Sequence, residues 1–141
     1  MCIRDSVWPE RLPFFVRISA TDWVPGGWDV DQSVVLARLL KQEGADLMDC
    51  SSGGLSLDQQ VPLGPGYQVP FAERIRREAG IATGAVGLIT QAQQADAIVR
   101  QGQADVVLIA RQSLRDPYWP LRAAHELSVD LPVPFQYRRG W

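Results

Sequence analysis

The sequence predicts an α/β fold of parallel strands, and three observations support that class. Short apolar runs without strict polar alternation occur four times, which is typical of strands buried on both faces. Each run is followed by a polar or glycine-rich loop and then by a stretch with helical periodicity. The 141 residues, 46% of them hydrophobic, suffice for one domain with a core. Four βα units could form a small open sheet or half of a (β/α)8 barrel, and composition does not decide between these.

The first unit begins with PFFVRIS, residues 13–19, a run rich in the aromatic and β-branched residues that favour strands. A loop containing Pro25-Gly26-Gly27 follows, and a helix is expected over residues 29–44, ended by Gly44. Four residues are expected to share its apolar face: Val35, Leu36, Leu39 and Leu40.

The second unit has residues 45–50 as its strand, followed by a long loop rich in glycine and proline. A helix is expected over residues 69–80. Pro70 suits its first turn, Phe71 and Ile75 lie one turn apart, and Gly80 ends it.

The third unit has residues 81–87 as its strand, and its helix is expected to open with Thr90 and Gln93 in capping-box spacing and to end at Gly102. The fourth strand is expected over residues 104–110.

The last predicted helix follows the fourth strand. Asp116-Pro117 is expected to cap it, and its apolar residues are Leu121, Ala124 and Leu127. Residues 7–128 are thus assigned to the predicted barrel half. Residues 129–141 form a tail whose prolines argue against a helix.

Charge and composition exclude several function classes. Fourteen basic and sixteen acidic residues give a net charge of -2 without the basic surface of a nucleic-acid-binding protein. Cys2 and Cys50 are too few and too far apart for a disulfide framework, which indicates a reducing compartment. The apolar runs are far shorter than the roughly 20 residues of a membrane helix. We therefore expect a soluble cytoplasmic protein; its first six residues, MCIRDS, are interpreted as a non-native N-terminal scar.

Two strand ends contain the candidate anion site. The carboxyl ends of parallel strands form the ligand-binding edge of such sheets. Gly87 lets the backbone approach a ligand closely, and a helix beginning near Thr90 would direct free N–H groups at the same place. Arg111 follows the fourth strand after Ala110 and would add a bidentate cation, so a phosphate is the expected ligand. The alternative is an ordinary ion pair between Arg111 and Asp116.

Arg17 lies within the first strand and would place a positive charge in the site if it pointed inward. The alternative is a buried ion pair with Asp46 or Asp49 on the next strand.

No hydrolase or metal site is indicated. A nucleophilic serine in the CSSGG run would need a histidine base, and the sole histidine, His125, lies on the last helix.

Five stretches taken in order resemble the C-terminal half of old yellow enzymes, above all the bacterial NAD(P)H-dependent flavin ene-reductases: FFVRISATDW, ADLMDCSSGG, PGYQVPFAERIRREAGIATGAVGLIT, ADVVLIARQSLRDPYW and PFQYRRGW. The resemblance implies a (β/α)8 TIM barrel that holds FMN, with residues 13–110 supplying its last four strands. It also implies NAD(P)H as reductant and an activated alkene as substrate.

The resemblance assigns roles to individual residues. Arg17 resembles the arginine at the pyrimidine edge of the flavin, and Ser51 the serine at its phosphate and ribitol side. Gly87, Ala110 and Arg111 match the phosphate nest, although many relatives have glycine in place of Ala110.

The tail and the missing segments complete the comparison. Arg139 resembles the arginine that this branch inserts into the active site of a neighbouring subunit, which implies a homo-oligomer; the alternative for Arg138 and Arg139 is a solvated terminus. The family's substrate-binding histidine pair, proton-donating tyrosine and flavin-tuning cysteine have no match here. We therefore assign no catalytic residue. We expect the half-barrel alone to be inactive, and either poorly soluble or dependent on the other half of the barrel.

Three functions follow from these interpretations. The first is a portion of an FMN-dependent NAD(P)H oxidoreductase that carries the flavin phosphate site. The second is a non-catalytic half-barrel that binds a phosphorylated ligand or self-associates. The third, against which Arg17 argues mildly, is a phosphate-binding barrel enzyme without flavin.

Overall fold

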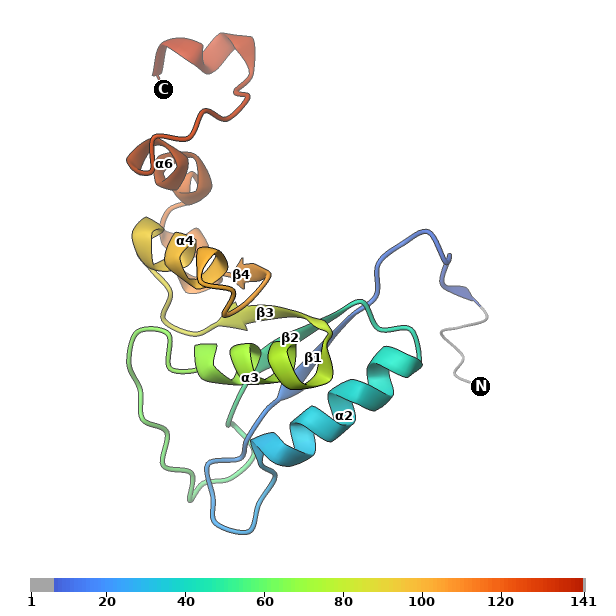
Figure 1. Ribbon diagram of the computed structural model, residues 1–141. Helices are drawn as coiled ribbons and strands as arrows, with labels where there is room; N and C mark the ends of the chain where they lie inside the picture. Colours follow the sequence, from blue (N-terminus) through green and yellow to red (C-terminus); the bar gives the residue numbers. More distant parts are fainter. Residues whose placement is uncertain (1–6, 141) are drawn as a thin grey trace.

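A computed structural model describes residues 7–140, in which four strands form one parallel sheet in the order β1-β2-β3-β4 (Figure 1). The strands are β1 (Phe15–Ser19), β2 (Leu47–Ser51), β3 (Ala82–Val86) and β4 (Val106–Leu108). The predicted α/β class with four parallel strands and alternating helices is confirmed. The proposed scar at residues 1–6 lies outside the described residues.

Helices follow each strand in turn. Their bounds are α2 (Val30–Gln42), α3 (Val69–Ala79), α4 (Ala92–Arg100), α5 (Arg111–Arg115) and α6 (Trp119–Glu126), with a 3₁₀ helix, η1 (Phe135–Gly140), in the tail. None of the helices in residues 7–140 is long and apolar enough to cross a membrane. Figure 1 shows α6 and η1 extending away from the sheet, whereas α2 and α3 lie side by side against it.

One face of the sheet packs against these helices. The core joins Met48 and Cys50 of β2 to Ile75 of α3, all of them fully buried, and Val16 and Ile18 of β1 pack against it. Because side chains alternate along a strand, Phe15, Arg17 and Ser19 point to the opposite face. The strand register places Leu47, Asp49 and Ser51 of β2 beside those three residues.

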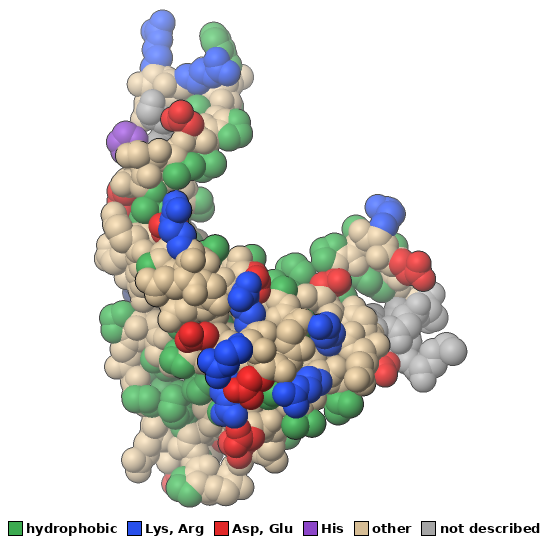
Figure 2. Space-filling model, in the orientation of Figure 1, with side chains coloured by type: hydrophobic (Ala, Val, Ile, Leu, Met, Phe, Trp, Pro, Cys, Tyr) green, Lys and Arg blue, Asp and Glu red, His purple; other side chains and the backbone are tan. Residues whose placement is uncertain are grey.

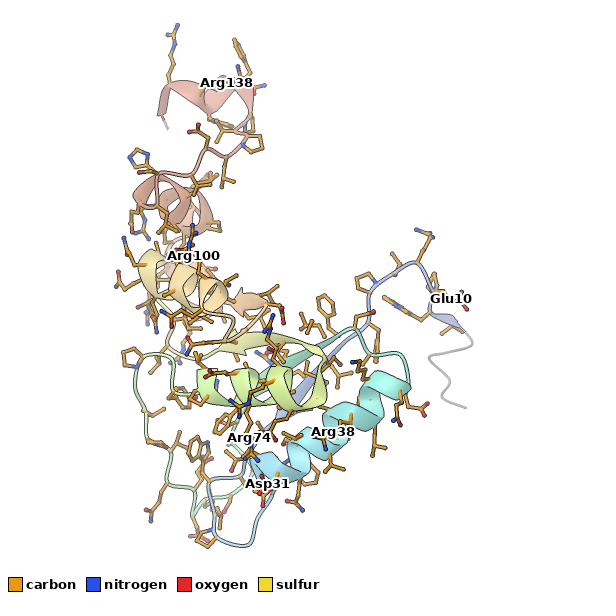
Figure 3. All side chains as sticks on the ribbon, viewed as in Figure 1. Glu10, Asp31, Arg38, Arg74, Arg100 and Arg138 are labelled. Atoms are coloured by element: carbon orange, nitrogen blue, oxygen red, sulfur yellow. The ribbon has the colours of Figure 1, made fainter. Side chains whose placement is uncertain are left out.

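The helix-covered surface carries charges of both signs. Figure 2 shows acidic and basic side chains interspersed over α2 and α3, and Figure 3 shows Arg74 beside Asp31. Arg74 forms ion pairs with Asp31 of α2 and with Glu78 of its own helix, and Arg38 donates to the Glu78 carbonyl. These contacts join the outer surfaces of the two helices.

The apolar face predicted for the first helix is partly wrong. Val35 is 54% exposed and Leu39 is exposed as well, while Ser33, Val34 and Ala37 face the sheet. Small side chains allow the helix to approach the strands closely, and the Ser33 hydroxyl is satisfied by donating to the Ala20 carbonyl. A polar residue therefore occupies an inner position that hydrophobicity alone assigns to a larger one.

The capping box predicted for the third helix is wrong. Gln91 is the N-cap of α4 without a side-chain cap, and the Thr90–Gln93 capping box does not form. The capping box occurs instead in α2, between Asp29 and Gln32.

In the C-terminal region α6 begins at Trp119, after the short helix α5, and its N-cap is Tyr118. Asp116 accepts the N–H of Tyr118 but does not cap the helix itself. The tail contains η1, whereas its prolines predicted no helix; Pro134 precedes that helix, and a proline at such a position removes no hydrogen bond within it.

Candidate phosphate and cofactor site

The turn after β3 and the end of β4 enclose a cavity of about 120 Å³. Gly87, Ala110 and Arg111, the three residues predicted to form an anion nest, all line it. Parallel neighbouring strands end at the same edge of the sheet, and the pairing of Val86 with Leu108 aligns those ends. Residues more than twenty positions apart in the sequence are thereby brought together.

Arg111 begins α5, is exposed, and forms no ion pair with any residue between 7 and 140. The alternative partner Asp116 instead accepts from Arg122, whose Nε lies 2.9 Å from its Oδ2. Arg115 also lines the cavity, one helical turn after Arg111. Within residues 7–140 neither arginine forms an ion pair, and two such residues beside one cavity suit a doubly charged anion such as a phosphate.

Sequence reasoning missed Arg115, although its i+4 spacing from Arg111 would place both on one side of a helix. It missed α5 because five residues before Asp116-Pro117 are too few for a recognisable helical period. It also expected a helix beginning near Thr90 to direct free N–H groups at the anion, whereas α4 begins at Ala92 and the N–H of Thr90 donates to Oε1 of Gln94 at 3.3 Å. The groups available to an anion in the cavity are therefore the two arginines and the backbone of the turn at Gly87, rather than the N–H of Thr90.

Gly87 has a φ of 118°, a conformation that favours glycine. A Cβ at this position would lie 2.7 Å from Nε2 of Gln68 and 2.9 Å from Cε1 of Tyr67. Both neighbours belong to the segment before α3, which packs behind the turn. Glycine is thus needed at Gly87 for steric as well as conformational reasons.

Arg17 and Ser51 lie on the opposite face of the sheet from the helices, and neither lines the cavity. The Arg17 alternative is observed: its Nε lies 2.8 Å from Oδ2 of Asp49, while Asp46 accepts the N–H of Phe14. The Arg17 side chain nevertheless remains 59% exposed, so this pair is not fully buried.

Asp49 is the more enclosed partner of that pair, with 15% of its side chain exposed. Its Oδ1 is buried without a hydrogen-bond partner among the described residues. Burial raises the pKa of Asp49 above its ordinary value, and the charge and hydrogen bond of Arg17 lower it to a smaller extent.

Arg139 lies in η1 and does not line the cavity. Arg138 of the same helix stands 5.6 Å from the ring centre of Phe135, a cation–π contact (Figure 3). The structure therefore does not bring Arg139 together with the other predicted residues.

Comparisons with known proteins extend over most of the chain. The chain is 54% identical over 129 residues to an NADPH dehydrogenase of Geobacillus sp. (strain WCH70), covering 92% of this chain and 38% of the relative. It is 50% identical over 137 residues to an NADPH dehydrogenase of Halalkalibacterium halodurans, covering 97% and 40%. The chain thus spans about two fifths of the length of the relatives it matches.

A structural likeness supports the fold. A mandelate racemase/muconate lactonizing family protein from Azoarcus sp. EbN1 matches 90% of this chain and 30% of its own, with a TM-score of 0.53 and 19% identity. At that identity the likeness concerns the fold alone, and it confirms that the four βα units are part of a (β/α)8 barrel.

The model of the NADH:flavin oxidoreductase / NADH oxidase family matches residues 3–130. The chain therefore belongs to the NADH:flavin oxidoreductase / NADH oxidase family.

Proposed function

We propose that the protein to which this chain belongs is an FMN-dependent NAD(P)H oxidoreductase of the cytoplasm. In this proposal the chain supplies the flavin phosphate site of the barrel, and the activity is reduction of activated C=C bonds. The observation that carries the proposal is the cavity lined by Gly87, Ala110 and Arg111, an arginine without an ion pair in residues 7–140, in a chain of this family.

The residues at this edge of the sheet fit FMN. The guanidinium groups of Arg111 and Arg115 supply the donor set that a phosphate monoester needs. Gly87 lines the same cavity, and in the proposal its backbone approaches the phosphate closely. FMN, when bound, would carry hydride between the nicotinamide and the substrate.

In the proposal the remaining predicted residues orient the cofactor. Arg17, exposed on the open face of β1, would present positive charge to the flavin ring, and Asp49 would hold its guanidinium in place. Ser51 ends β2 on that same face and would donate its hydroxyl to the ribitol or phosphate side. Ala110 contributes backbone and a methyl group to the cavity.

The test uses a chimera in which this chain replaces the matching segment of the Geobacillus sp. relative, because the chain covers only 38% of that relative. We expect the purified chimera to retain FMN, seen by its absorption spectrum, and to oxidise NADPH when an activated alkene is added. Arg111→Ala should lower FMN affinity by between about tenfold and a hundredfold. Arg122→Ala is the matched control, since Arg122 pairs with Asp116 outside the cavity.

Each outcome decides between the candidate functions. FMN binding with alkene-dependent NADPH oxidation supports the oxidoreductase. Binding of FMN or inorganic phosphate without any turnover supports the non-catalytic alternative. A folded chimera that binds neither contradicts the phosphate site altogether.

Arg139 is proposed to act in a neighbouring subunit of a homo-oligomer. Arg139→Ala should then raise KM for the alkene while leaving FMN affinity unchanged. Arg138→Ala is the control, because Arg138 already contacts Phe135. An unchanged KM in the Arg139→Ala chimera would contradict this role.

A further inference from the structure

A continuous chain of side-chain hydrogen bonds runs behind the candidate anion cavity. The indole Nε1 of Trp23 donates to Oγ of Ser52 at 2.9 Å, and Ser52 donates to Oε1 of Gln68 at 2.7 Å. The Gln68 amide Nε2 then donates to the Val86 carbonyl at 2.8 Å. This series of hydrogen bonds thus connects the loops after β1 and β2 to the end of β3.

The direction of every bond in this chain is determined by chemistry. An indole N–H can only donate and a backbone carbonyl can only accept, so the Gln68 amide has one possible orientation. Gln68 is only 2% exposed, and water cannot replace a lost partner without rearrangement. The side chain is therefore held at both ends.

Gln68 fixes the backbone that lines the cavity. Its Nε2 binds the carbonyl immediately before Gly87, and the N–H of Gly66 donates to the Gly87 carbonyl at 3.0 Å. The peptide groups on both sides of Gly87 are consequently held from the segment before α3. The same amide nitrogen is the closest atom to a Cβ built at Gly87.

We propose that Gln68, oriented by Ser52 and Trp23, is a positioning residue that sets the Gly87 backbone for recognition of a phosphate group. This inference rests on the proposed function, in which the phosphate belongs to FMN. It follows that the loop after β1, where Trp23 adopts a φ of 59°, is coupled to phosphate recognition after β3.

The protein contains a matched hydrogen-bond chain that serves as a control. Trp28 donates from Nε1 to Oγ of Ser33 at 2.6 Å, and Ser33 donates to the Ala20 carbonyl at 2.9 Å. It also runs from a tryptophan through a serine to a backbone carbonyl, but it contains no glutamine, and it links α2 to the end of β1. Neither Ser33 nor Ala20 lines the cavity.

The experiment compares the affinities of the chimera for FMN and riboflavin, which differ by the phosphate. Gln68→Met preserves the length of the side chain and removes both bonds of the amide. We expect it to weaken FMN binding about tenfold, as the loss of one oriented polar contact would, while riboflavin affinity stays the same. Ser52→Ala should change the ratio of FMN affinity to riboflavin affinity in the same direction by a smaller factor.

The control separates positioning from general destabilisation. Ser33→Ala should lower the melting temperature as Ser52→Ala does, but leave the ratio of FMN to riboflavin affinity unchanged. An unchanged ratio in Gln68→Met, or an equal loss of both flavins, overturns the inference. If Gln68→Met does not fold, the same criteria apply to Ser52→Ala.

A second probe separates this inference from the proposed function. If the parent chimera binds no FMN but is stabilised by inorganic phosphate in a thermal melt, the flavin assignment fails. The positioning role then predicts that Gln68→Met abolishes the stabilisation by phosphate and Ser33→Ala retains it. Equal stabilisation of Gln68→Met and the parent would overturn the role.

Discussion

The β1–β2 region and the β3–β4 region each place an arginine near the candidate cofactor, but the two arginines have different surroundings. Arg17 lies within β1 beside Asp49 in register, and the two side chains form an ion pair. Arg111 follows β4, which ends after three residues, so Arg111 starts a helix instead of facing a neighbouring strand. The strand register thus places a carboxylate beside Arg17, whereas Arg111 lies outside the strands and has no such neighbour in register.

This difference teaches that an arginine next to a predicted strand is not by itself evidence of a ligand. Arg17 contributes to the fold through Asp49 and keeps part of its charge exposed. The exposed guanidinium of Arg111 forms no ion pair within residues 7–140, so it remains available to an external anion.

The largest expected effect comes from a substitution in the β3–β4 region. Gly87→Ala should lower the free energy of unfolding by about 3 kcal/mol, because the new Cβ would clash with Gln68 and Tyr67 at an unfavourable φ. Gly26→Ala is the control: Gly26 has a φ of 76°, but a Cβ there meets nothing within 4 Å, so only about 1 kcal/mol should be lost. Chemical denaturation measures both. Equal losses would contradict the steric role of Gly87.

Substituting the two arginines tests the comparison directly. Arg17→Met leaves the enclosed Asp49 without its counter-ion and should cost about 1–2 kcal/mol of unfolding free energy. Arg111→Met removes no ion pair and should change stability by less than about 0.5 kcal/mol. The same denaturation measurement decides, and a greater loss for Arg111→Met would reverse the assignment of roles.

Asp49→Asn tests the β1–β2 region through the pH dependence of stability. The raised pKa of Asp49 means that the folded state takes up this proton at a higher pH than the unfolded chain, whose carboxyl has the ordinary value of 3.8. The stability that this carboxyl contributes is therefore present below pH 3.8 and is lost as the pH rises through the raised pKa. The stability of wild type relative to Asp49→Asn should fall over that window, as measured by urea denaturation at several pH values. A relative stability that rises with pH there would contradict the dominance of burial.

The smallest effect concerns the carboxylate that Arg111 does not use. Arg122→Ala removes the exposed pair with Asp116 and should cost no more than about 0.5 kcal/mol, an effect that salt weakens. Thermal melts at low and high ionic strength would measure it. A loss of several degrees that persists at high salt would show that Asp116 and Arg122 do more than form a surface pair.

Residue pattern alone predicts all four strands, because parallel strands read as continuous apolar runs, although β4 covers three residues where residues 104–110 were expected. It also predicts the meeting of Gly87 with Arg111, since the ends of parallel strands share one edge of the sheet. The orientation of α2 is not predictable in this way. Leucine and valine occur on more than one side of that helix, and close packing selects the side with Ser33 and Ala37.

The part of the site least visible in the sequence is Gln68. It lies in a loop with no local signature, and its importance arises from Ser52 and Val86, which are sixteen and eighteen residues away. The sequence likewise leaves open whether Asp46 or Asp49 pairs with Arg17, because the strand register that brings Asp49 beside Arg17 is a tertiary feature. Both features depend on tertiary contacts that no periodicity encodes.

The sheet order has a consequence for how the polypeptide reaches this state. Each strand pairs with the strand nearest to it in sequence, so no pairing in the sheet requires a distant segment to arrive first. The entropic cost of closing each connection is therefore similar from one βα unit to the next. Assembly by successive addition of units is the kinetic route that such local topology favours.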